Sequence, residues 1–378
     1  MIICEKSDNN QIINERFKSF EDKIKVPQKD NVNLKTKDST KNSEYNKKNI
    51  INRKSEIEFI KNNIPYLSET FEIQNCIGKG SSGVVYKGIH KKNKKQVAIK
   101  FFINEKGKEK REQKDKNQAQ EIALSKKLHH KNIIEMFAYN KTENVDYSII
   151  EFGKYGDLVN FLKNLLKRGV FSETTLNYIA TQILEGLNYL HRSKTVHLDI
   201  KPENILIDAQ LEAKIIDFSV SCPYGSFHPE DLVRFPFVGT GKFMAPEIID
   251  KTHMKIKEAE KIDVYSLGAT LYYLFFGDHP YELKNVPSNK YEEILKNIKE
   301  KKLEFPKDRK VSEKCKDFFC KTLEKDYLKR ITIREALNHP WIQGSKYIFE
   351  EKENTYCLES FLIKLITDNI PKFNEYIK

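Results

Sequence analysis

Eight consecutive residues, from His197 to Asn204, carry side chains suited to moving a phosphoryl group. Asp199 can accept the proton of a hydroxyl group, Lys201 can contact a phosphate oxygen, and Asn204 can bind a magnesium ion. The Lys two positions and the Asn five positions after the Asp form a set that phosphoryl transfer can use directly. The spacing of these three residues therefore predicts a catalytic loop.

A glycine-rich segment upstream is suited to binding the phosphates of a nucleotide. Its six residues are Gly78, Lys79, Gly80, Ser81, Ser82 and Gly83. Dinucleotide-binding loops look similar, but in those a helix begins at the last glycine. Here strand-like runs flank the segment on both sides. This favours a hairpin whose backbone N–H groups can approach phosphate closely because glycine has no side chain.

A lysine in the next strand-like run is a second candidate for contacting phosphate. Most lysines at the end of a strand are simply exposed to solvent. After a loop of this kind, however, the ammonium of Lys100 in Val97-Ala-Ile-Lys100 can reach the α- and β-phosphates. Glu121, in the following helical pattern, is the carboxylate expected to hold Lys100 in place.

The elements that must position these residues change in type along the chain. Short strand-like runs, broken by glycines and charged turns, are expected at 71–77, 83–88, 96–102, 133–139 and 147–152, with one helical pattern at about 117–128. Beyond Gly156 the periodicity is mainly helical, for instance at 176–191 and 264–276. A small sheet-rich lobe before a larger helical lobe is an α+β arrangement, with the functional cleft expected at their junction.

Both ends of the chain differ from this middle part. Residues 1–70 are polar and have too few apolar side chains to offset the entropy of ordering, so we expect a mostly disordered extension, with a short helical piece near 57–60. The tail at 343–378 holds apolar residues at 358, 361, 362, 365 and 366, which form one stripe of a helix. The simpler interpretation is that this helix packs on the neighbouring lobe; the alternative is a helix that binds a partner or inhibits the chain.

Composition argues against several other classes of protein. No apolar run reaches about 18 residues and the first residues turn polar at once, so we expect no membrane span and an intracellular location, cytoplasmic or nuclear. The six cysteines are scattered, which predicts reduced thiols rather than zinc sites or disulfides. The net charge is +12, but the lysine-rich stretches lack interleaved aromatic residues. A solvated surface is therefore favoured over a nucleic-acid partner.

Taken in order, these motifs resemble those of the eukaryotic protein kinase domain, from Phe71 to about Ile342. Further similar motifs are Asp217-Phe-Ser219, Ala245-Pro-Glu247, Asp263-Val-Tyr-Ser-Leu-Gly268 and Arg330. Lys201 and the segment after Gly239 resemble the serine/threonine branch, and the residues from Arg330 to Trp341 are similar to calmodulin-dependent and checkpoint-type kinases. The resemblance implies a two-lobed fold, with an N-lobe at 71–152 and a C-lobe at 153–342. It also implies transfer of a phosphoryl group from ATP, with Mg²⁺, to Ser or Thr of protein substrates.

The resemblance also implies a role for each site residue. The adenine ring is expected between Ile77, Val85, Ala98 and Leu206, although these apolar residues could simply be core. The backbone of Glu151 to Gly153 would bond the adenine edge, and Asp157 would meet the ribose. Asn204 and Asp217 would bind Mg²⁺, and Thr240 would hydrogen-bond Asp199 and Lys201. Glu247 and Arg330 would form a buried, structural ion pair.

Three residues depart from the family pattern. Leu198 replaces the Arg that clamps a phosphate on the activation segment, Ser219 replaces a Gly, and Ser125 replaces an apolar residue. None of them removes a group that performs chemistry. Leu198 predicts that phosphorylation between Ser219 and Thr240 is not required for activity. Two alternatives remain: a catalytically silent kinase fold that serves as a scaffold, and a basic nucleic-acid-binding module.

Overall fold

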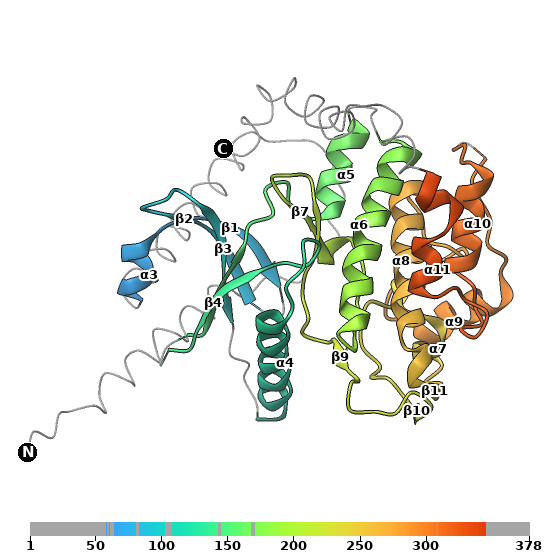
Figure 1. Ribbon diagram of the computed structural model, residues 1–378, viewed down its shortest axis with the longest axis horizontal. Helices are drawn as coiled ribbons and strands as arrows, with labels where there is room; N and C mark the ends of the chain where they lie inside the picture. The colour runs from blue at the N-terminus through green and yellow to red at the C-terminus, as the bar shows by residue number, and fades with distance from the viewer. Residues whose placement is uncertain are drawn as a thin grey trace, which may run out of the picture. The chain divides into compact units, whose positions relative to one another are not determined.

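The computed structural model describes residues 58, 60, 64–80, 83–102, 108–142, 145–167, 171–307 and 309–344. The chain divides into two compact units. The N-terminal unit comprises residues 1–122 and 135–152, and the C-terminal unit comprises 123–134 and 153–378. A β-sheet dominates the first unit and helices dominate the second, which is the two-lobed α+β fold that the sequence predicts (Figure 1).

The N-terminal unit is built on one antiparallel sheet with the strand order β1-β2-β3-β5-β4. Its elements are α3 (Pro65–Thr70), β1 (Phe71–Gly80), β2 (Gly83–His90), β3 (Gln96–Phe102), α4 (Lys108–Lys127), β4 (Met136–Asn140) and β5 (Tyr147–Glu151), although the end of α4, from residue 123, is assigned to the C-terminal unit. Helix α4 begins well before residue 117, where the sequence predicts its start. The prediction misses the first half of the helix because that half consists of charged and amide side chains and shows no apolar period.

The strand register gives the sheet two different faces. Side chains directly opposite each other on neighbouring antiparallel strands share a face. Val85 pairs with Lys100, and Ala98 pairs with Ile150, so these four lie on one face. The intervening residues form the buried core of the opposite face, which is Val84, Tyr86, Val97, Ile99, Phe101, Tyr147 and Ile149.

Helix α3 packs on this second face, through Leu67, together with Ile64 and Ile60. The spacing of these three residues is that of one helical stripe, but it is short and lies in a polar stretch, so composition alone assigns it to the extension. The packed unit thus starts upstream of Phe71, where the sequence predicts the domain to begin. Most of the predicted extension, at 1–57, lies outside the described residues.

The C-terminal unit is mainly helical. Its elements are α5 (Leu158–Lys167), α6 (Glu173–Arg192), β6 (Thr195–Val196), the 3₁₀ helix η1 (Pro202–Asn204), β7 (Ile205–Ile207), β8 (Ala213–Ile215), β9 (Cys222–Pro223), β10 (Leu232–Val233), η2 (Gly241–Phe243), α7 (Pro246–Ile249), β11 (Met254–Lys255), η3 (Ile256–Glu258), α8 (Glu260–Phe276), α9 (Tyr291–Glu300), α10 (Glu313–Thr322) and α11 (Ile333–Leu337). Helices α6 and α8 lie side by side, and α5 contacts η1 and β7 (Figure 1).

Helix α8 forms the centre of this unit. Nearly all its residues are buried, and Gly277 ends it in a left-handed conformation at φ 73° that suits glycine. Helix α6 is preceded by the N-cap Ser172, whose side chain accepts a hydrogen bond from the Thr175 N–H. The pairs β6–β9, β7–β8 and β10–β11 are short antiparallel ladders that hold the loops between the helices.

Two expectations from the sequence are not tested by the described residues. The tail helix predicted at 358–366 lies outside them, so its docking on a lobe or a partner stays a prediction. The intracellular location stays a prediction as well. Among the described helices, none is long and apolar enough to cross a membrane.

Candidate active site

The predicted catalytic loop lies between β6 and β7 and is anchored by one buried carboxylate. Asp263, on α8, accepts hydrogen bonds from the backbone N–H groups of His197 at 2.8 Å and Leu198 at 2.9 Å. His191 Nε2 lies 2.8 Å from the same carboxylate. Burial alone would raise the pKa of Asp263, but the hydrogen bond and charge of His191 and the neighbouring His197 outweigh it and lower that pKa. The loop backbone is therefore held by an ionised group.

The polar side chains of this loop form one connected cluster around Asp199. Lys201 Nζ lies 2.6 Å from Asp199 Oδ2 and 2.7 Å from Thr240 Oγ1. Thr240 Oγ1 donates to Asp199 Oδ1 at 2.9 Å. Asn204 Nδ2 donates to the carbonyl oxygen of Asp199 at 2.8 Å and to its Oδ2 at 3.0 Å. We refer to Asp199, Lys201, Asn204 and Thr240 as the Asp199 cluster.

A glycine allows Thr240 to reach this cluster. Gly239 has φ 108°, and a Cβ atom placed on it would lie 2.5 Å from the carbonyl oxygen of Leu198. No larger residue could bring the two backbone segments this close without displacing one of them. Leu198 itself has φ 67° and a buried side chain, so the backbone strain of the loop lies next to Asp199.

Asp217 follows strand β8 and also has a left-handed backbone, at φ 67°. Its Oδ1 accepts a hydrogen bond from the Ser219 N–H at 3.3 Å. Phe218 is fully buried, with its ring centroid 5.6 Å from that of His197. Ser219 is not among the residues with positive φ, so a serine fits where the family has glycine. Ser125 is buried as well.

The N-terminal unit holds the predicted pair of Lys100 and Glu121. Lys100 Nζ lies 2.5 Å from Glu121 Oε1, and both side chains are almost fully buried. Lys100 is on β3 and Glu121 is on α4, so the pair joins the helix to the sheet face that carries Val85 and Ala98. The expected ion pair is confirmed.

The glycine-rich segment includes the end of β1 and the start of β2, where Gly80 pairs with Gly83. A Cβ atom on Gly83 would lie 2.1 Å from the carbonyl oxygen of Phe101, so packing of the sheet requires this glycine. Gly80, by contrast, has open space where a Cβ would lie. Lys79 and Ile77 are exposed on β1, and Ser81 and Ser82 lie outside the described residues. A Cβ on Gly78 would lie 3.8 Å from Val85 Cβ, an ordinary contact, so packing of the protein explains neither Gly78 nor Gly80.

The residues expected to bind the adenine belong to both units and are described for each unit separately. Val85 is half-buried and Ala98 is buried on one face of the sheet. The N–H of Glu151 donates to the carbonyl of Glu135 at 2.9 Å, so that N–H is not free for a ligand. In the C-terminal unit, a Cβ on Gly153 would lie 2.9 Å from Leu206 Cβ, which means that these two residues are in close contact.

Asp157, the expected ribose ligand, already has a structural role. Its Oδ1 accepts a hydrogen bond from the Asn160 N–H at 2.8 Å, and its Oδ2 accepts one from Asn160 Nδ2 at 3.0 Å. These bonds cap the first turn of α5.

We therefore expect Asp157→Ala to lower the free energy of unfolding by about 1 kcal/mol, the usual cost of losing such a cap. Chemical denaturation in the absence of nucleotide measures this directly. Asp157→Asn, which can keep the cap, is the control and should be near wild type; an unchanged stability in Asp157→Ala would contradict the capping role.

The segment from Ser219 to Thr240, which corresponds to the activation segment, is bonded to the rest of the C-terminal unit at its start. Strand β9 pairs with β6, and the Tyr224 N–H donates to the carbonyl of Lys194 at 2.8 Å. Ser221 Oγ donates to the carbonyl of His197, and the Tyr224 hydroxyl donates to the carbonyl of His191. Ser221 and Tyr224 are both buried, whereas Ser226 is exposed.

A carboxylate anchors the middle of the same segment. Glu230 lies 2.8 Å from Lys255 Nζ and 2.6 Å from Lys257 Nζ. Hydrogen bonds from these two lysines lower the pKa of Glu230 to about 2. Because the pKa is lowered, the carboxylate stays charged through the acidic range in which an ordinary glutamate becomes protonated, and it loses its charge only as the pH falls toward about 2. Strands β10 and β11 pair beside it.

The contact of Glu230 with its two lysines is one that the sequence does not reveal. Lys255 and Lys257 follow Glu230 by 25 and 27 residues, and the three residues match no local motif. Exposed charges of this kind are common in a chain of such composition, so only the folded backbone shows which ones meet.

The buried ion pair predicted between Glu247 and Arg330 is present. Arg330 Nη1 lies 2.6 Å from Glu247 Oε1, and Nη2 lies 3.0 Å from Oε2, which is a two-pronged contact. Arg330 Nε also donates to the carbonyl of Glu324 at 2.8 Å. Neither side chain has appreciable contact with solvent.

Comparison with known proteins agrees with these motifs. The family model of the protein kinase domain matches residues 71–342. Over 285 residues the chain is 31% identical to myosin light chain kinase A of Dictyostelium discoideum, with 74% of this chain and 90% of that protein covered. It is 34% identical to the probable serine/threonine-protein kinase MARK-A of the same organism, over 75% of this chain, and 32% identical to its Aurora kinase, over 73%.

The chain spans 25% of the length of MARK-A and 66% of the length of the Aurora kinase. These names come from several kinase groups, which is compatible with the weak similarity to calmodulin-dependent and checkpoint-type kinases. The family match and the relatives lead to one conclusion: the chain belongs to the protein kinase family, in its serine/threonine branch.

Proposed function

We propose that the chain transfers the γ-phosphoryl group of ATP to serine or threonine hydroxyls of protein substrates, with Asp199 accepting the hydroxyl proton. The observation that carries this proposal is the Asp199 cluster. Three donors, on Lys201, Asn204 and Thr240, fix both carboxylate oxygens before any substrate arrives. Since phosphoryl transfer relies on positioning and on electrostatic stabilisation, a base held in this way is suited to the reaction.

The donor set fits ATP with magnesium, which kinases of this family use. In the proposed assignment Asp217 supplies a carboxylate and Asn204 its amide oxygen, since the amide nitrogen is bonded to Asp199. Hard oxygen ligands of this type suit Mg²⁺, which keeps several waters and phosphate oxygens and needs few protein ligands. Binding of Mg²⁺ in this way does not need a cluster of three or more His, Cys, Asp or Glu side chains, and the described residues contain no such cluster. The bound ion would neutralise charge on the phosphates.

The remaining residues would bind and orient ATP. Lys100, held by Glu121, would contact the α- and β-phosphates, and the residues from Gly78 to Gly83 would cover them. Ile77, Val85, Ala98 and Leu206 would contact the adenine, with the backbone from Glu151 to Gly153 at its edge. Asp157 would reach the ribose. These residues belong to a catalytic domain at 71–342, which α3 extends upstream.

The direct test is incubation of the purified full chain with radiolabelled ATP, Mg²⁺ and an arrayed library of Ser-, Thr- and Tyr-containing peptides. Labelling of Ser or Thr peptides is expected. Binding of ATP without labelling of any peptide or of the chain itself would instead favour the silent scaffold. The same array gives the residue preference around the acceptor.

We further propose that this kinase does not need a phosphate on its activation segment. Leu198 cannot bind such a phosphate, because its side chain is apolar and buried. The segment is instead supported by β9, by Tyr224 and by the charges of Glu230, Lys255 and Lys257. A carboxylate between two lysines provides the kind of contact that a phosphate forms with basic residues elsewhere.

Phosphatase treatment of the purified chain should therefore change its activity by less than about tenfold, which corresponds to about 1.4 kcal/mol of barrier. Ser226→Ala, which removes an exposed acceptor in the segment, should likewise behave as wild type, whereas Glu230→Gln should lose more activity than Ser226→Ala. Initial rates on one peptide substrate measure all three. A loss of tenfold or more after phosphatase treatment contradicts the proposal.

A further inference from the structure

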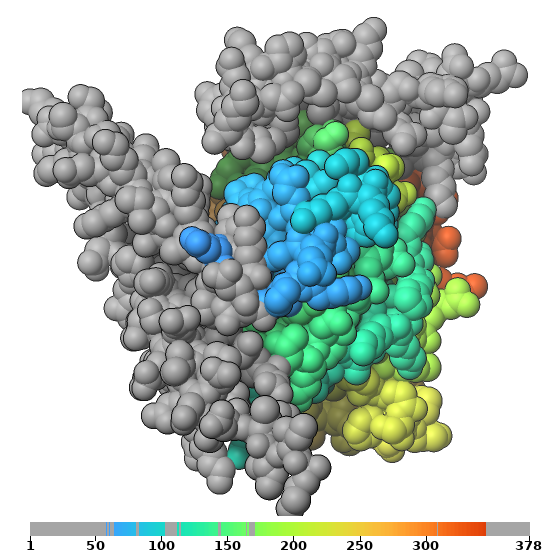
Figure 2. Space-filling model, turned by 90° about the vertical axis from the view of Figure 1, so that its left-hand side faces the viewer, coloured from blue at the N-terminus to red at the C-terminus, as the bar shows by residue number. Residues whose placement is uncertain are grey.

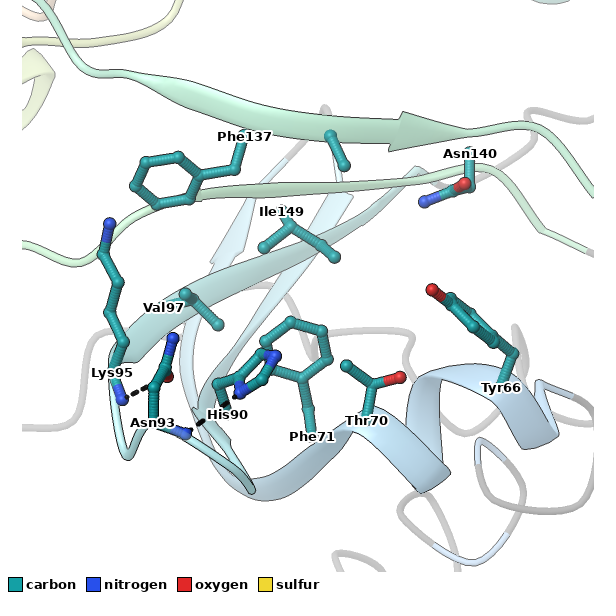
Figure 3. Close-up of a pocket in the computed structure, with 11 residues that line it drawn as sticks. Tyr66, Thr70, Phe71, His90, Asn93, Lys95, Val97, Phe137, Asn140 and Ile149 are labelled. Carbon is teal, nitrogen blue, oxygen red and sulfur yellow. Dashed lines mark hydrogen bonds between the residues drawn. The ribbon is translucent and has the colours of Figure 1, made fainter.

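A cavity of about 320 Å³ opens in the N-terminal unit on the sheet face that carries α3 (Figure 3). Its floor is formed by Phe71, Val97 and Ile149, which are buried side chains of the core on that face. Tyr66, from α3, and Phe137, from β4, stand at its edges (Figure 3). Lys100 and Ala98 lie on the opposite face of the same sheet, so the cavity is separate from the proposed nucleotide-binding residues.

The two edge aromatics are unusually exposed. Tyr66 is 69% exposed and Phe137 is 38% exposed, although both are large apolar side chains. Single exposed apolar residues are normal on a protein surface, but apolar residues gathered at a cavity mark sites of interaction. The blue and cyan atoms of this part of the chain form a surface of the unit in Figure 2.

One border of the cavity is strongly basic. The turn between β2 and β3 contains Lys91, Lys92, Lys94 and Lys95, and all four are exposed. Lys91 Nζ donates to the carbonyl of Ser68, and Lys95 Nζ lies 3.9 Å from the ring centroid of Phe137. None of the four forms an ion pair with a carboxylate in the described part of the chain. Their positive charges are therefore available to an incoming anion.

We propose that this cavity is a docking site for an acidic segment of a partner protein, which inserts one bulky apolar side chain between Tyr66 and Phe137. The cavity is at the small end of the range for binding sites and suits a single aromatic or branched aliphatic side chain. Carboxylates beside that side chain would meet the lysines of the turn, which favours association and selects against basic partners.

Two other occupants fit the observations less well. A single-stranded nucleic acid needs aromatic faces for its bases, but the ammonium of Lys95 lies over the ring of Phe137. The chain's own segment 1–57 precedes α3, but it has more Lys and Arg than Asp and Glu and would be repelled by the four lysines. An acidic partner segment satisfies both the charge and the cavity.

The test uses the full chain and short fluorescent peptides of Glu, Asp and Gly whose central residue is Phe, Trp, Leu or Ala. At low salt at least one of the first three should bind with a dissociation constant of about 10–100 μM, and at least about tenfold tighter than the Ala peptide. Affinity should fall as salt is raised, because the charges are exposed. Fluorescence anisotropy measures each constant.

Variants then identify the surface. The double variant Lys92→Glu/Lys95→Glu should weaken peptide binding by at least about tenfold. Ala138→Leu narrows the cavity and leaves the charge of the protein unchanged, and it should weaken peptide binding by at least about tenfold as well. The matched control Lys290→Glu/Lys314→Glu, which reverses two exposed lysines elsewhere, should keep the wild-type affinity. Thermal unfolding and peptide phosphorylation establish that each variant is folded.

Several results would overturn the proposal. These are equal affinity for the Phe, Trp, Leu and Ala peptides, and binding that survives Lys92→Glu/Lys95→Glu. Tighter binding of a short single-stranded RNA than of any peptide, lost in the same variant, would identify a nucleic-acid surface instead. A large gain in peptide affinity on deleting residues 345–378 would make the chain's own tail the occupant.

Discussion

Replacing Asp199 with Asn should reduce phosphoryl transfer by about 10²- to 10⁴-fold, the range that a positioned general base contributes, while ATP binding survives. The amide can still accept a hydrogen bond from Lys201 or Thr240, so the loop should keep its shape. It cannot take the proton of a substrate hydroxyl. The loss should therefore appear in kcat rather than in the affinity for ATP.

Single-turnover transfer of labelled phosphate to the best peptide of the array measures the rate of phosphoryl transfer. Equilibrium binding of a fluorescent ATP analogue measures the affinity for ATP. Asp250→Asn removes one carboxylate from an exposed ion pair with Lys299 in the same unit, and should match wild type in both assays. Near-normal turnover by Asp199→Asn would reject the assigned role, and loss of ATP binding would point to a structural effect instead.

Much of this site is predictable from sequence because its chemistry is local or has a fixed order. The spacing of Asp199, Lys201 and Asn204 places them in one loop, and that loop is found between β6 and β7. Lys100 and Glu121 lie on different elements, but each is recognisable from the motif around it, and they meet at 2.5 Å. Alternation along the strands predicts the sheet and helical periodicity predicts α6, whereas α8 is apolar on nearly all sides and is predicted from its long apolar run.

Other features depend on contacts that no motif contains. Helix α3 is short and lies in a polar stretch, so its burial is visible only once the sheet face that Leu67 covers has formed. Glu230 meets Lys255 and Lys257 because β10 and β11 pair. An aspartate can serve as a ribose ligand or as a helix cap. Sequence alone therefore does not show that Asp157 caps α5.

The backbone at Leu198 shows why a departure from a family pattern is best judged in the fold. The backbone at this position is held by the N–H bond to Asp263 and by the close approach of Gly239, and its side chain is buried. The two backbone contacts do not depend on the type of side chain, and they are the contacts that lie next to Asp199. This is consistent with our proposal that Leu198 alters control rather than chemistry.

Arg330→Met should lower the free energy of unfolding of the C-terminal unit by about 3–5 kcal/mol, because it leaves Glu247 buried without its partner. The chain's one tryptophan, Trp341, is buried in this unit, where its Nε1 donates to Glu173. Its fluorescence during urea denaturation therefore follows the unit that holds the ion pair. Lys329→Met, at the exposed neighbouring lysine, is the control and should change stability by less than about 0.5 kcal/mol.

The double variant Glu247→Gln/Arg330→Met distinguishes the net contribution of the ion pair to stability from the destabilisation caused by leaving one buried charge without its partner. Removing both charges removes the unpaired carboxylate, so the double variant should lose less stability than the sum of the two single variants. A loss below about 1 kcal/mol in Arg330→Met would show that water or another residue can replace the guanidinium. Because Glu247 lies a few residues after Thr240, where the activation segment ends, the less stable single variants should also lose phosphoryl transfer at temperatures where wild type and Lys329→Met remain active.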